Sequence, residues 1–192
     1  MKKFISAAVL FFSVYTVFAQ EILTDRRDGN KYRTVIISNK TWMAENLRFK
    51  SKTGSVFYDN DINNSADFGM LYNWKAAQTA CPDGWHLPSG SEFRELSNHF
   101  QNHESWRTKN GDTLSFEISL GGMQDHEGTF SELNESAYYW TSTEYDKHSA
   151  EYFSYLIIDK MVVTDISRKE DIEDIPGTDK RDRYSVRCVK NQ

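Results

Sequence analysis

Apolar positions recur at helical spacing in two short stretches near the middle of the chain. In the first stretch, Trp74, Ala77 and Cys81 stand at positions i, i+3 and i+7, which lie on one face of a helix. Asn73 is a residue type that caps helix N-termini, and the Pro-Asp-Gly turn at 82–84 ends the stretch. The pattern predicts a short amphipathic helix that directs Cys81 toward the core.

The second helical stretch begins with a clear N-terminal signal. Ser89 and Glu92 form the S-x-x-E pattern of a capping box, in which each side chain accepts a hydrogen bond from the other residue's backbone amide. Phe93, Leu96 and Phe100 follow at spacings that place them on one apolar face. We therefore expect a second short helix that packs this face against the core.

Runs of β-branched and aromatic residues predict strands on both sides of these helices. Asp28-Gly29 predicts a hairpin turn within residues 25–30, and Ser38-Asn39 is a second turn-like pair. Gly121-Gly122 interrupts the strand pattern of the second half. The expected strands span residues 32–37, 41–43, 113–120, 137–142, 152–158, 161–166 and 184–189.

Two segments lack any such periodicity. Residues 51–68 are rich in Gly, Asn, Asp and Ser, so we expect a surface loop. Residues 167–182 combine runs of charge with one proline and one glycine, and we expect a mobile, solvated loop there. Together these patterns predict an α+β fold with two short helices and a mostly antiparallel sheet.

The first residues of the chain predict export. A basic pair and an apolar run lead to Val17-Phe18-Ala19, which a signal peptidase can accept, so we expect Met1–Ala19 to be removed. Residues 20–192 suit one domain. An uncleaved anchor is the alternative, although the run is shorter than the roughly 20 apolar residues that a spanning helix needs. Gln20 stands where a lipoprotein has its cysteine, so we expect a secreted, periplasmic or cell-surface protein without lipid or membrane span.

Composition narrows the classes of partner. The formal net charge is −5 and becomes −7 when the two lysines of the signal are removed. Nucleic acid and anionic membranes are therefore poor candidates, and an unidentified protein or glycan is the expected partner. Aromatic residues make up 14% of this polar chain. They either fill the core or line a binding face.

The chain has two cysteines, Cys81 and Cys188, which lie far apart in the sequence. In an exported protein an even number of cysteines predicts a disulfide. A bridge that closes a loop of ~100 residues stabilises a fold by about 4 to 5 kcal/mol in the chain-entropy model. Two free thiols are the alternative.

Six sequence blocks, in order, cover nearly all of residues 20–192. They are Asp25-x-Arg27-Asp28-Gly29-x-x-Tyr32-x-Thr34-Val35, Trp42-Met43-Ala44-Glu45-Asn46-Leu47, Leu71-Tyr72-Asn73-Trp74-x-Ala76-Ala77, Cys81-Pro82-x-Gly84-Trp85-His86-Leu87-Pro88-Ser89-x-x-Glu92-Phe93, Tyr139-Trp140-Thr141-Ser142-Thr143-Glu144 and Ser185-Val186-Arg187-Cys188-Val189-Lys190. These blocks resemble the Fibrobacter succinogenes major paralogous domain family. The resemblance implies an exported bacterial protein, commonly at the cell surface, with Cys81 and Cys188 in the family's cysteine positions. It implies no established activity.

The order of elements also resembles a C-type-lectin-like domain. In such a domain two helices flank a sheet whose ends are joined by a disulfide, here between Cys81 and Cys188. True lectins bind calcium and sugar through Glu-Pro-Asn or Gln-Pro-Asp and Trp-Asn-Asp tripeptides, and none of these occurs in this chain. The resemblance therefore implies the fold without calcium-dependent sugar binding.

Candidate metal sites are incomplete. Asp59-Asn60-Asp61-Ile62-Asn63 begins like a calcium loop, but Asn64 and Met70 replace the glycine and the bidentate glutamate of that pattern. His99 and His103 are four residues apart, as paired zinc ligands can be, but the stretch reads better as a polar helix end. We expect no metal site, and calcium at 59–63 stays open.

Catalytic motifs are also missing. The chain has no nucleophile elbow, phosphate-binding loop or dinucleotide fingerprint, so we expect no cofactor and no catalytic residue. Both cysteines occupy the structural positions of the resemblance, which leaves no thiol nucleophile. We interpret His86 as a packed core histidine. A hydrolase that uses two converging carboxylates stays possible, because sequence does not show which acids converge.

Aromatic residues crowd one strand region. On a strand, alternate residues face opposite ways, so half of them point away from the core-facing side unless both faces are covered. In lectin-like domains this region commonly forms the recognition surface, so the resemblance implies that Trp140, Glu144 and Tyr145 bind the ligand, independently of EDTA. The aromatic residues are Tyr138, Tyr139, Trp140, Tyr145, Tyr152, Phe153 and Tyr155.

The expected function is a non-catalytic binding or surface-interaction module with an unknown ligand. A structural subunit of an extracellular assembly is the second possibility. An extracellular carbohydrate-active hydrolase is the third.

Overall fold

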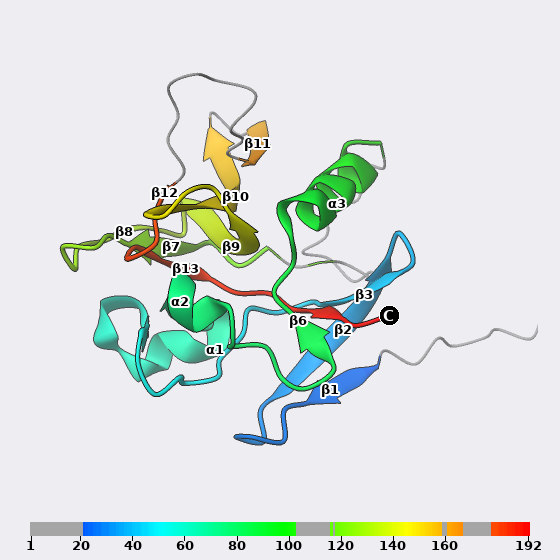
Figure 1. Ribbon diagram of the computed structural model, residues 1–192, viewed down its shortest axis with the longest axis horizontal. Coiled ribbons are helices and arrows are strands. Elements are labelled where there is room, and N and C mark those ends of the chain that lie inside the picture. The colour runs from blue at the N-terminus through cyan, green and yellow to red at the C-terminus, as the bar shows by residue number, and fades with distance from the viewer. Residues whose placement is uncertain (1–20, 103–115, 117, 159–160, 167–177) are drawn as a thin grey trace, which may run out of the picture.

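The chain forms the predicted α+β fold with short helices and mostly antiparallel pairing, but its strands make two sheets where one was expected (Figure 1). A computed structural model describes residues 21–102, 116, 118–158, 161–166 and 178–192. The expected signal at 1–19 lies outside these residues, as does most of the expected mobile loop at 167–182. Among the described residues, no helix has the length and apolar character needed to cross a membrane.

The first sheet has five strands in the order β1-β2-β3-β14-β6. The hairpins β1–β2 and β2–β3 pair strands that are neighbours in the sequence. Strand β14 brings the end of the chain between β3 and β6. All its ladders are antiparallel. The strands are β1 (Ile22–Thr24), β2 (Lys31–Ile37), β3 (Lys40–Met43), β14 (Val189–Lys190) and β6 (Trp85–His86).

The second sheet has nine strands, of which seven follow the order β11-β10-β9-β7-β13-β5-β4. Strand β12 pairs with β10 and β8 pairs with β7, and only the contacts of β9 with β7 and β13 are parallel. The strands are β4 (Ser55–Val56), β5 (Leu71–Asn73), β7 (Gly121–Gln124), β8 (Phe130–Leu133), β9 (Ser136–Glu144), β10 (Ser149–Ile158), β11 (Met161–Ile166), β12 (Thr178–Asp179) and β13 (Arg183–Ser185).

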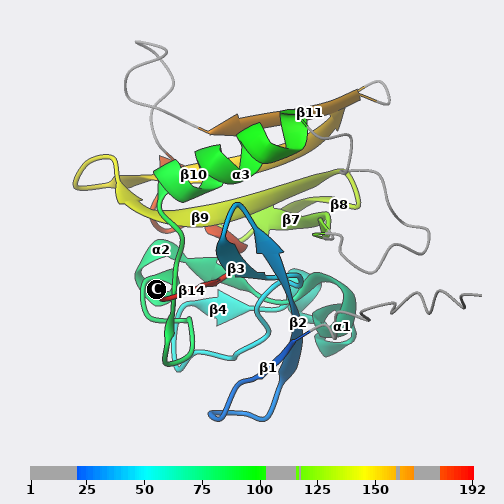
Figure 2. The same ribbon diagram turned by 90° about the vertical axis from the view of Figure 1, so that its right-hand side faces the viewer.

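The main helix is α3 (Gly90–Asn102), and its predicted capping box is confirmed. The amide of Glu92 donates to Ser89 Oγ at 3.2 Å, and the amide of Ser89 donates to Glu92 Oε2 at 2.9 Å. Figure 2 shows α3 lying across β9 and β10. Phe93 and Leu96, on the inner face of this helix, are buried, and the Phe93 ring stacks on Phe153 with 4.9 Å between the ring centroids.

The first predicted helix is much shorter than expected. Helix α2 (Trp74–Ala77) begins where predicted, because the Asn73 side chain accepts from the amide of Ala76 at 2.9 Å. It ends four residues before Cys81, which lies in a bend and is half-buried. The prediction that the helix carries Cys81 is therefore wrong, although the apolar side of its first turn is buried.

Several predicted strand and loop boundaries also change. The segment 51–68 is not a plain loop, since it contains β4, two 3-10 turns at Tyr58–Asn60 and Ile62–Asn64, and α1 (Ser65–Phe68). Within the expected strand 113–120, the described residues Phe116 and Ile118–Leu120 do not belong to a strand, and the other residues lie outside the described part of the chain. Strand β7 starts at Gly121, where an interruption was expected.

Two predicted turns have different outcomes. Ser38 and Asn39 form the tight two-residue turn between β2 and β3, both with positive φ. The hairpin around Asp28-Gly29 is present but has a six-residue loop, because β1 ends at Thr24 and β2 begins at Lys31. Gly29 alone takes a positive φ there, of 80°.

The core is divided between the two faces of β9. Tyr139 belongs to a cluster with α3 and Trp42, while its neighbour Trp140 belongs to a second cluster with Tyr72 and Tyr184. Adjacent strand residues point to opposite faces, so both faces of this strand are covered. The predicted disulfide is present between Cys81 and Cys188, whose Cα atoms are 5.8 Å apart, and it ties the bend after α2 to the residue before β14.

Candidate functional site

The residues that the sequence nominated for ligand recognition do not lie together on one surface. Trp140 has no exposed side-chain area, and its Nε1 donates to the carbonyl of Tyr72 at 2.6 Å. Its ring stacks on Tyr184 at 4.6 Å. A direct contact between Trp140 and a surface ligand is therefore not compatible with this geometry, and its role is packing.

Glu144 and Tyr145 lie at the end of β9, where the strand reaches solvent. The Glu144 side chain is 59% exposed and forms an ion pair with Lys180, whose Nζ lies 4.6 Å from the centre of the Trp74 ring. Tyr145 is half-buried. The sequence did not nominate Lys180 or Trp74, and ligand binding by Glu144 and Tyr145 stays a prediction.

The other nominated residues are engaged with their neighbours. Asp61 Oδ1 accepts from the backbone and side-chain amides of Asn63, both at 2.9 Å. His99 Nδ1 lies 3.4 Å from Ser38 Oγ, while His103 lies outside the described residues. No group of three or more His, Cys, Asp or Glu within the described part of the chain could hold a metal ion.

His86 is not the packed core histidine that the sequence suggested. Its side chain is 40% exposed, with Nδ1 2.7 Å from Asn191 Oδ1 and Nε2 3.2 Å from Glu92 Oε1. Glu92 thus serves both the helix cap and this histidine. The contacts attach the start of α3 to the end of the chain, and the role of His86 is structural.

A polar pocket of ≈280 Å³ lies where β2, the segment after β3 and helix α1 meet. Small-molecule sites usually occupy about 300 to 1,000 Å³, so the pocket suits a small ligand or one unit of a longer chain. Charged and polar side chains supply most of its wall. The lining residues are Arg33, Glu45, Asn46, Arg48, Ala66, Asp67, Gly69 and Ser119.

Glu45 fixes the charged side of the pocket. Its Oε1 accepts from Arg33 Nε at 2.7 Å, and its Oε2 accepts from Arg48 Nη1 at 2.9 Å. Burial raises the pKa of Glu45, but the hydrogen bonds from Arg33 and Arg48 outweigh burial and hold the pKa below its usual range. The carboxylate is therefore ionised at neutral pH, and the two guanidinium groups are held in place before any ligand arrives.

Asn46 and Gly69 form the inner wall of the pocket. Asn46 Nδ2 donates to the carbonyl of Phe68 at 2.9 Å, and Oδ1 accepts from the buried Arg187 Nε at 2.9 Å. Gly69 has a φ of 77°, and a Cβ at this position would lie 2.7 Å from Asn46 Cβ. The wall is therefore rigid, and no larger residue than glycine fits at 69 without displacement.

Asp67, from α1, lines the same pocket as the two arginines and is exposed. Its carboxylate can accept hydrogen bonds, while the guanidinium groups of Arg33 and Arg48 donate them. Ser119 adds a hydroxyl that can do either. The pocket thus offers donors and acceptors within one cavity, which suits a ligand that carries several hydroxyl groups.

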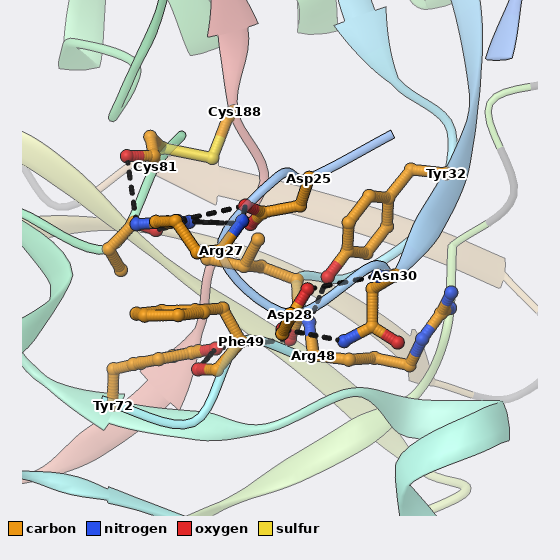
Figure 3. Close-up of polar contacts among 12 residues, drawn as sticks. Asp25, Arg27, Asp28, Asn30, Tyr32, Arg48, Phe49, Tyr72, Cys81 and Cys188 are labelled. Atoms are coloured by element: carbon orange, nitrogen blue, oxygen red, sulfur yellow. Dashed lines mark hydrogen bonds and ion pairs between the residues drawn. A yellow bond between two sulfur atoms is a disulfide. The ribbon is translucent and has the colours of Figure 1, made fainter. Parts of the chain in front are cut away.

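A second polar network attaches the β1–β2 loop to the disulfide (Figure 3). Arg27 Nε and Nη2 donate to Asp25 at 2.9 and 2.7 Å, and Nη2 also donates to the carbonyl of Ala80 at 2.7 Å. The guanidinium carbon lies 3.7 Å from the centre of the Phe49 ring. Because this guanidinium donates to three residues and stacks on Phe49, we interpret Arg27 as a structural clamp.

The same network holds the segment after β3 against β2. Tyr32 Oη accepts from the amide of Arg48 at 3.0 Å, and Arg48 Nη2 donates to the carbonyl of Lys31 at 2.6 Å. Figure 3 shows Tyr32, Arg48 and Asn30 on the same side of this network. The pocket wall and the β1–β2 loop therefore form one supported unit.

Sequence reasoning missed the pocket. Glu45 and Asn46 belong to one of the quoted blocks, but Arg33 stands at an unspecified position of the first block, and Arg48 and Asp67 fall between blocks. The available signal was the concentration of positive charge between residues 25 and 52. That signal does not name Asp67 or Ser119, because chain folding alone brings α1 and residue 119 to β2.

A family model described as Fibrobacter succinogenes major domain matches residues 35–190 of the chain. Neither a curated protein nor a solved structure matches it. The matched range contains every lining residue of the pocket except Arg33.

Proposed function

The chain belongs to the Fibrobacter succinogenes major domain family, and since that membership names no reaction, we propose from the pocket that the protein is an exported, non-catalytic binding module for a hydroxyl-rich ligand, with a glycan as the leading class. The observation that carries this proposal is that Asp67 and the arginine pair Arg33 and Arg48 line one pocket. Sugar hydroxyls both donate and accept hydrogen bonds, so they can satisfy the carboxylate and the guanidinium groups at once.

The ionic state of Glu45 supports binding over acid-base chemistry. A general acid at neutral pH needs a carboxyl whose pKa is raised toward the working pH. The hydrogen bonds from Arg33 and Arg48 lower the pKa of Glu45 instead. Both carboxylate oxygens are already accepting hydrogen bonds, which fits a fixed positioning group.

Export and a C-type-lectin-like arrangement are part of the same proposal. The disulfide between Cys81 and Cys188 fits an oxidising compartment, and α3 covers one face of β9 and β10 as the second helix of that fold does. Mass spectrometry of the exported protein should find a mature chain that starts at or near Gln20. Recovery of a membrane-bound chain that retains Met1 would contradict this part of the proposal.

A glycan and protein array probed with the mature chain tests the proposed function. We expect signals confined to a set of related glycans, unaffected by EDTA. For the strongest of these, Asp67→Ala should weaken the affinity by about tenfold, because one charged hydrogen-bond acceptor contributes about 1.5 to 3 kcal/mol. Calorimetry gives the affinity, and the melting temperature should stay unchanged because Asp67 is exposed.

Asp83→Ala is the matched control, since Asp83 is also an exposed aspartate but lies in the turn before β6. It should retain the affinity of the unmodified chain. Equal losses in the two variants would show that the pocket is not the site. An array without any glycan signal would contradict the proposed ligand class.

A further inference from the structure

Positive charge is concentrated in one part of an otherwise acidic chain. Residues 25–52 contain eight Lys and Arg but only three Asp and Glu, a net charge of +5. Because the whole chain carries −5, the remaining residues carry −10. The modest overall charge therefore conceals a strong separation of charge along the sequence.

The fold keeps this charge together in space. The β1–β2 loop and the segment after β3 are in direct contact, since Arg27 stacks on Phe49 at 3.7 Å and Arg48 donates to the carbonyl of Lys31. Lys31 and Arg33 are two apart on β2 and so lie on one face of that strand. Figure 3 shows the loop residue Asn30 beside Arg48. Lys31 and Lys50 are therefore each two residues from an arginine that lines the pocket, Arg33 or Arg48, on two segments that touch each other.

Four of these cations are exposed and available to a partner. They form what we call the basic face: Arg26, Lys31, Lys50 and Lys52. No acid in the described part of the chain forms an ion pair with any of the four. Two exposed acids belong to the same region: Asp67 lines the pocket, and Asp28, in the β1–β2 loop, already accepts from the amide of Asn30 at 2.9 Å.

Other charges in this region are already compensated. Arg27 pairs with Asp25 at 2.7 Å, and Arg33 pairs with Glu45 at 2.7 Å. These pairs build the scaffold, and the basic face lies outside them. Four uncompensated cations on two touching segments attract polyanions and repel polycations, with a strength that falls as salt is added.

We infer that the basic face binds the anionic groups of an acidic glycan while the adjacent pocket holds its hydroxyl groups, an inference that rests on the proposed glycan-binding function. Carboxylate or sulfate groups along a sugar chain would meet Arg26, Lys31, Lys50 and Lys52. The Asp67 carboxylate in the pocket can accept from a sugar hydroxyl, and the arginines that Glu45 positions can donate to one. A uronic or sulfated polysaccharide satisfies both features, whereas a nucleic acid or a phospholipid surface satisfies only the first.

The test compares polygalacturonate with neutral galactan as probes for the mature chain. We expect tighter binding of polygalacturonate at low salt, and we expect the difference to shrink as salt rises. Lys31→Gln combined with Lys50→Gln should weaken polygalacturonate binding by about tenfold at low salt, because it removes two of the four exposed cations that attract the anionic chain. Binding of galactan should not change.

Lys147→Gln combined with Lys190→Gln is the control, because it removes the same charge from exposed lysines outside the basic face. It should leave both affinities within about twofold. Equal binding of the two polysaccharides, or equal losses in the two variants, would overturn the inference. So would tighter binding to duplex DNA or to phosphatidylglycerol vesicles than to polygalacturonate.

These outcomes separate the inference from the proposed function. If galactan binds and Asp67→Ala weakens it while polygalacturonate has no advantage, the basic face is not used but the binding pocket stands. If neither polysaccharide binds and the glycan array is empty, both the inference and the proposed function fall.

Discussion

Arg27 joins three separate parts of the molecule through one side chain. It pairs with Asp25 in its own loop, stacks on Phe49 and donates to the carbonyls of Ala80 and Cys81 beside the disulfide. The planar guanidinium group allows stacking and several in-plane hydrogen bonds at once, which a lysine ammonium does not. The identity of this residue therefore matters more than its charge.

Arg27→Lys should lower the free energy of unfolding by about 1 to 3 kcal/mol, because it keeps the charge but removes the in-plane hydrogen bonds to the carbonyls of Ala80 and Cys81. Arg26→Lys, in the neighbouring exposed residue, should change stability by less than about 0.5 kcal/mol. Urea unfolding of both variants measures the difference. Similar midpoints for the two would show that Arg27 is not a clamp.

The ion pair between Asp25 and Arg27 depends on pH. Burial raises its pKa, but hydrogen bonds from Arg27 outweigh burial, so the pKa is lower in the folded state than in the unfolded chain. A lowered pKa stabilises the fold above the unfolded value of about 3.9, and this contribution is lost as the pH falls through the folded pKa.

We therefore expect the urea midpoint to fall as the pH is lowered below about 5, and to fall less steeply in Asp25→Asn. Unfolding series of both proteins from neutral to acidic pH check this. Parallel pH profiles would contradict a role for ionised Asp25.

Single residues were predictable where the signal is local. The capping box of Ser89 and Glu92 depends on four consecutive residues, and both of its hydrogen bonds are present. The position of Trp140 depends on what covers each face of β9, and α2 and β13 supply that cover from distant parts of the sequence. For that reason the aromatic run predicted the strand but left open whether Trp140 is buried or exposed.

At the scale of elements, glycine sets the end of α1 and the shape of the pocket together. Gly69 caps α1 with a φ of 77°, which lets the chain turn directly into Met70 and β5. The close approach to Asn46 leaves no space for a Cβ. The short helix, the turn and the inner wall of the pocket therefore depend on one residue.

Gly69→Ala should destabilise the fold more than Gly84→Ala. Both glycines have a positive φ, of 77° and 80°, so both substitutions carry backbone strain of about 1 to 2 kcal/mol. A Cβ at 69 also meets Asn46 Cβ at 2.7 Å and the carbonyl of Leu47 at 2.9 Å, while at 84 nothing lies within 4 Å. Thermal unfolding should show the larger loss for Gly69→Ala, and equal losses would argue against the close approach.

The existence of most elements could be predicted from the sequence, and their ends could not. Strands β9 and β10 carry long aromatic and β-branched runs that outweigh local ambiguity. Helix α2 stops at Ala77 because the chain must turn to bring Cys81 to Cys188, a constraint that periodicity does not contain. The expected closing strand 184–189 is divided for a similar reason, since β13 and β14 belong to different sheets.

At the scale of the whole molecule, the disulfide ties the middle of the chain to its end. It spans a sequence separation of 107 residues and places β14 between β3 and β6. In the chain-entropy model a loop of this length contributes about 4 to 5 kcal/mol by restricting the unfolded chain. Stability should therefore depend strongly on the redox state.

Cys81→Ser combined with Cys188→Ser should lower the free energy of unfolding by about 4 kcal/mol, near the whole stability of a small domain. Dithiothreitol should reproduce this loss in the unmodified protein and have no effect on the double variant. Urea unfolding with and without the reductant gives the comparison. Insensitivity of the unmodified protein to the reductant would contradict the contribution of the bridge.

The family, the disulfide and the α+β class were accessible from the sequence because each rests on residues in fixed order. The pocket was not, because Arg33, Asp67 and Ser119 come from three segments that only the folded chain brings together. Charge gave part of the signal, yet the net value of −5 obscured the +5 of residues 25–52. Averages over a chain remove the spatial information on which recognition depends.

The most direct test of the account is an amide NMR titration of the mature chain with oligogalacturonate. The account predicts shifts that concentrate at Arg33, Glu45, Arg48 and Asp67 and extend to Lys31 and Lys50, with little change at Glu144 and Tyr145. Shifts centred on Glu144 and Tyr145, or a spectrum that the oligosaccharide leaves unchanged, would contradict it.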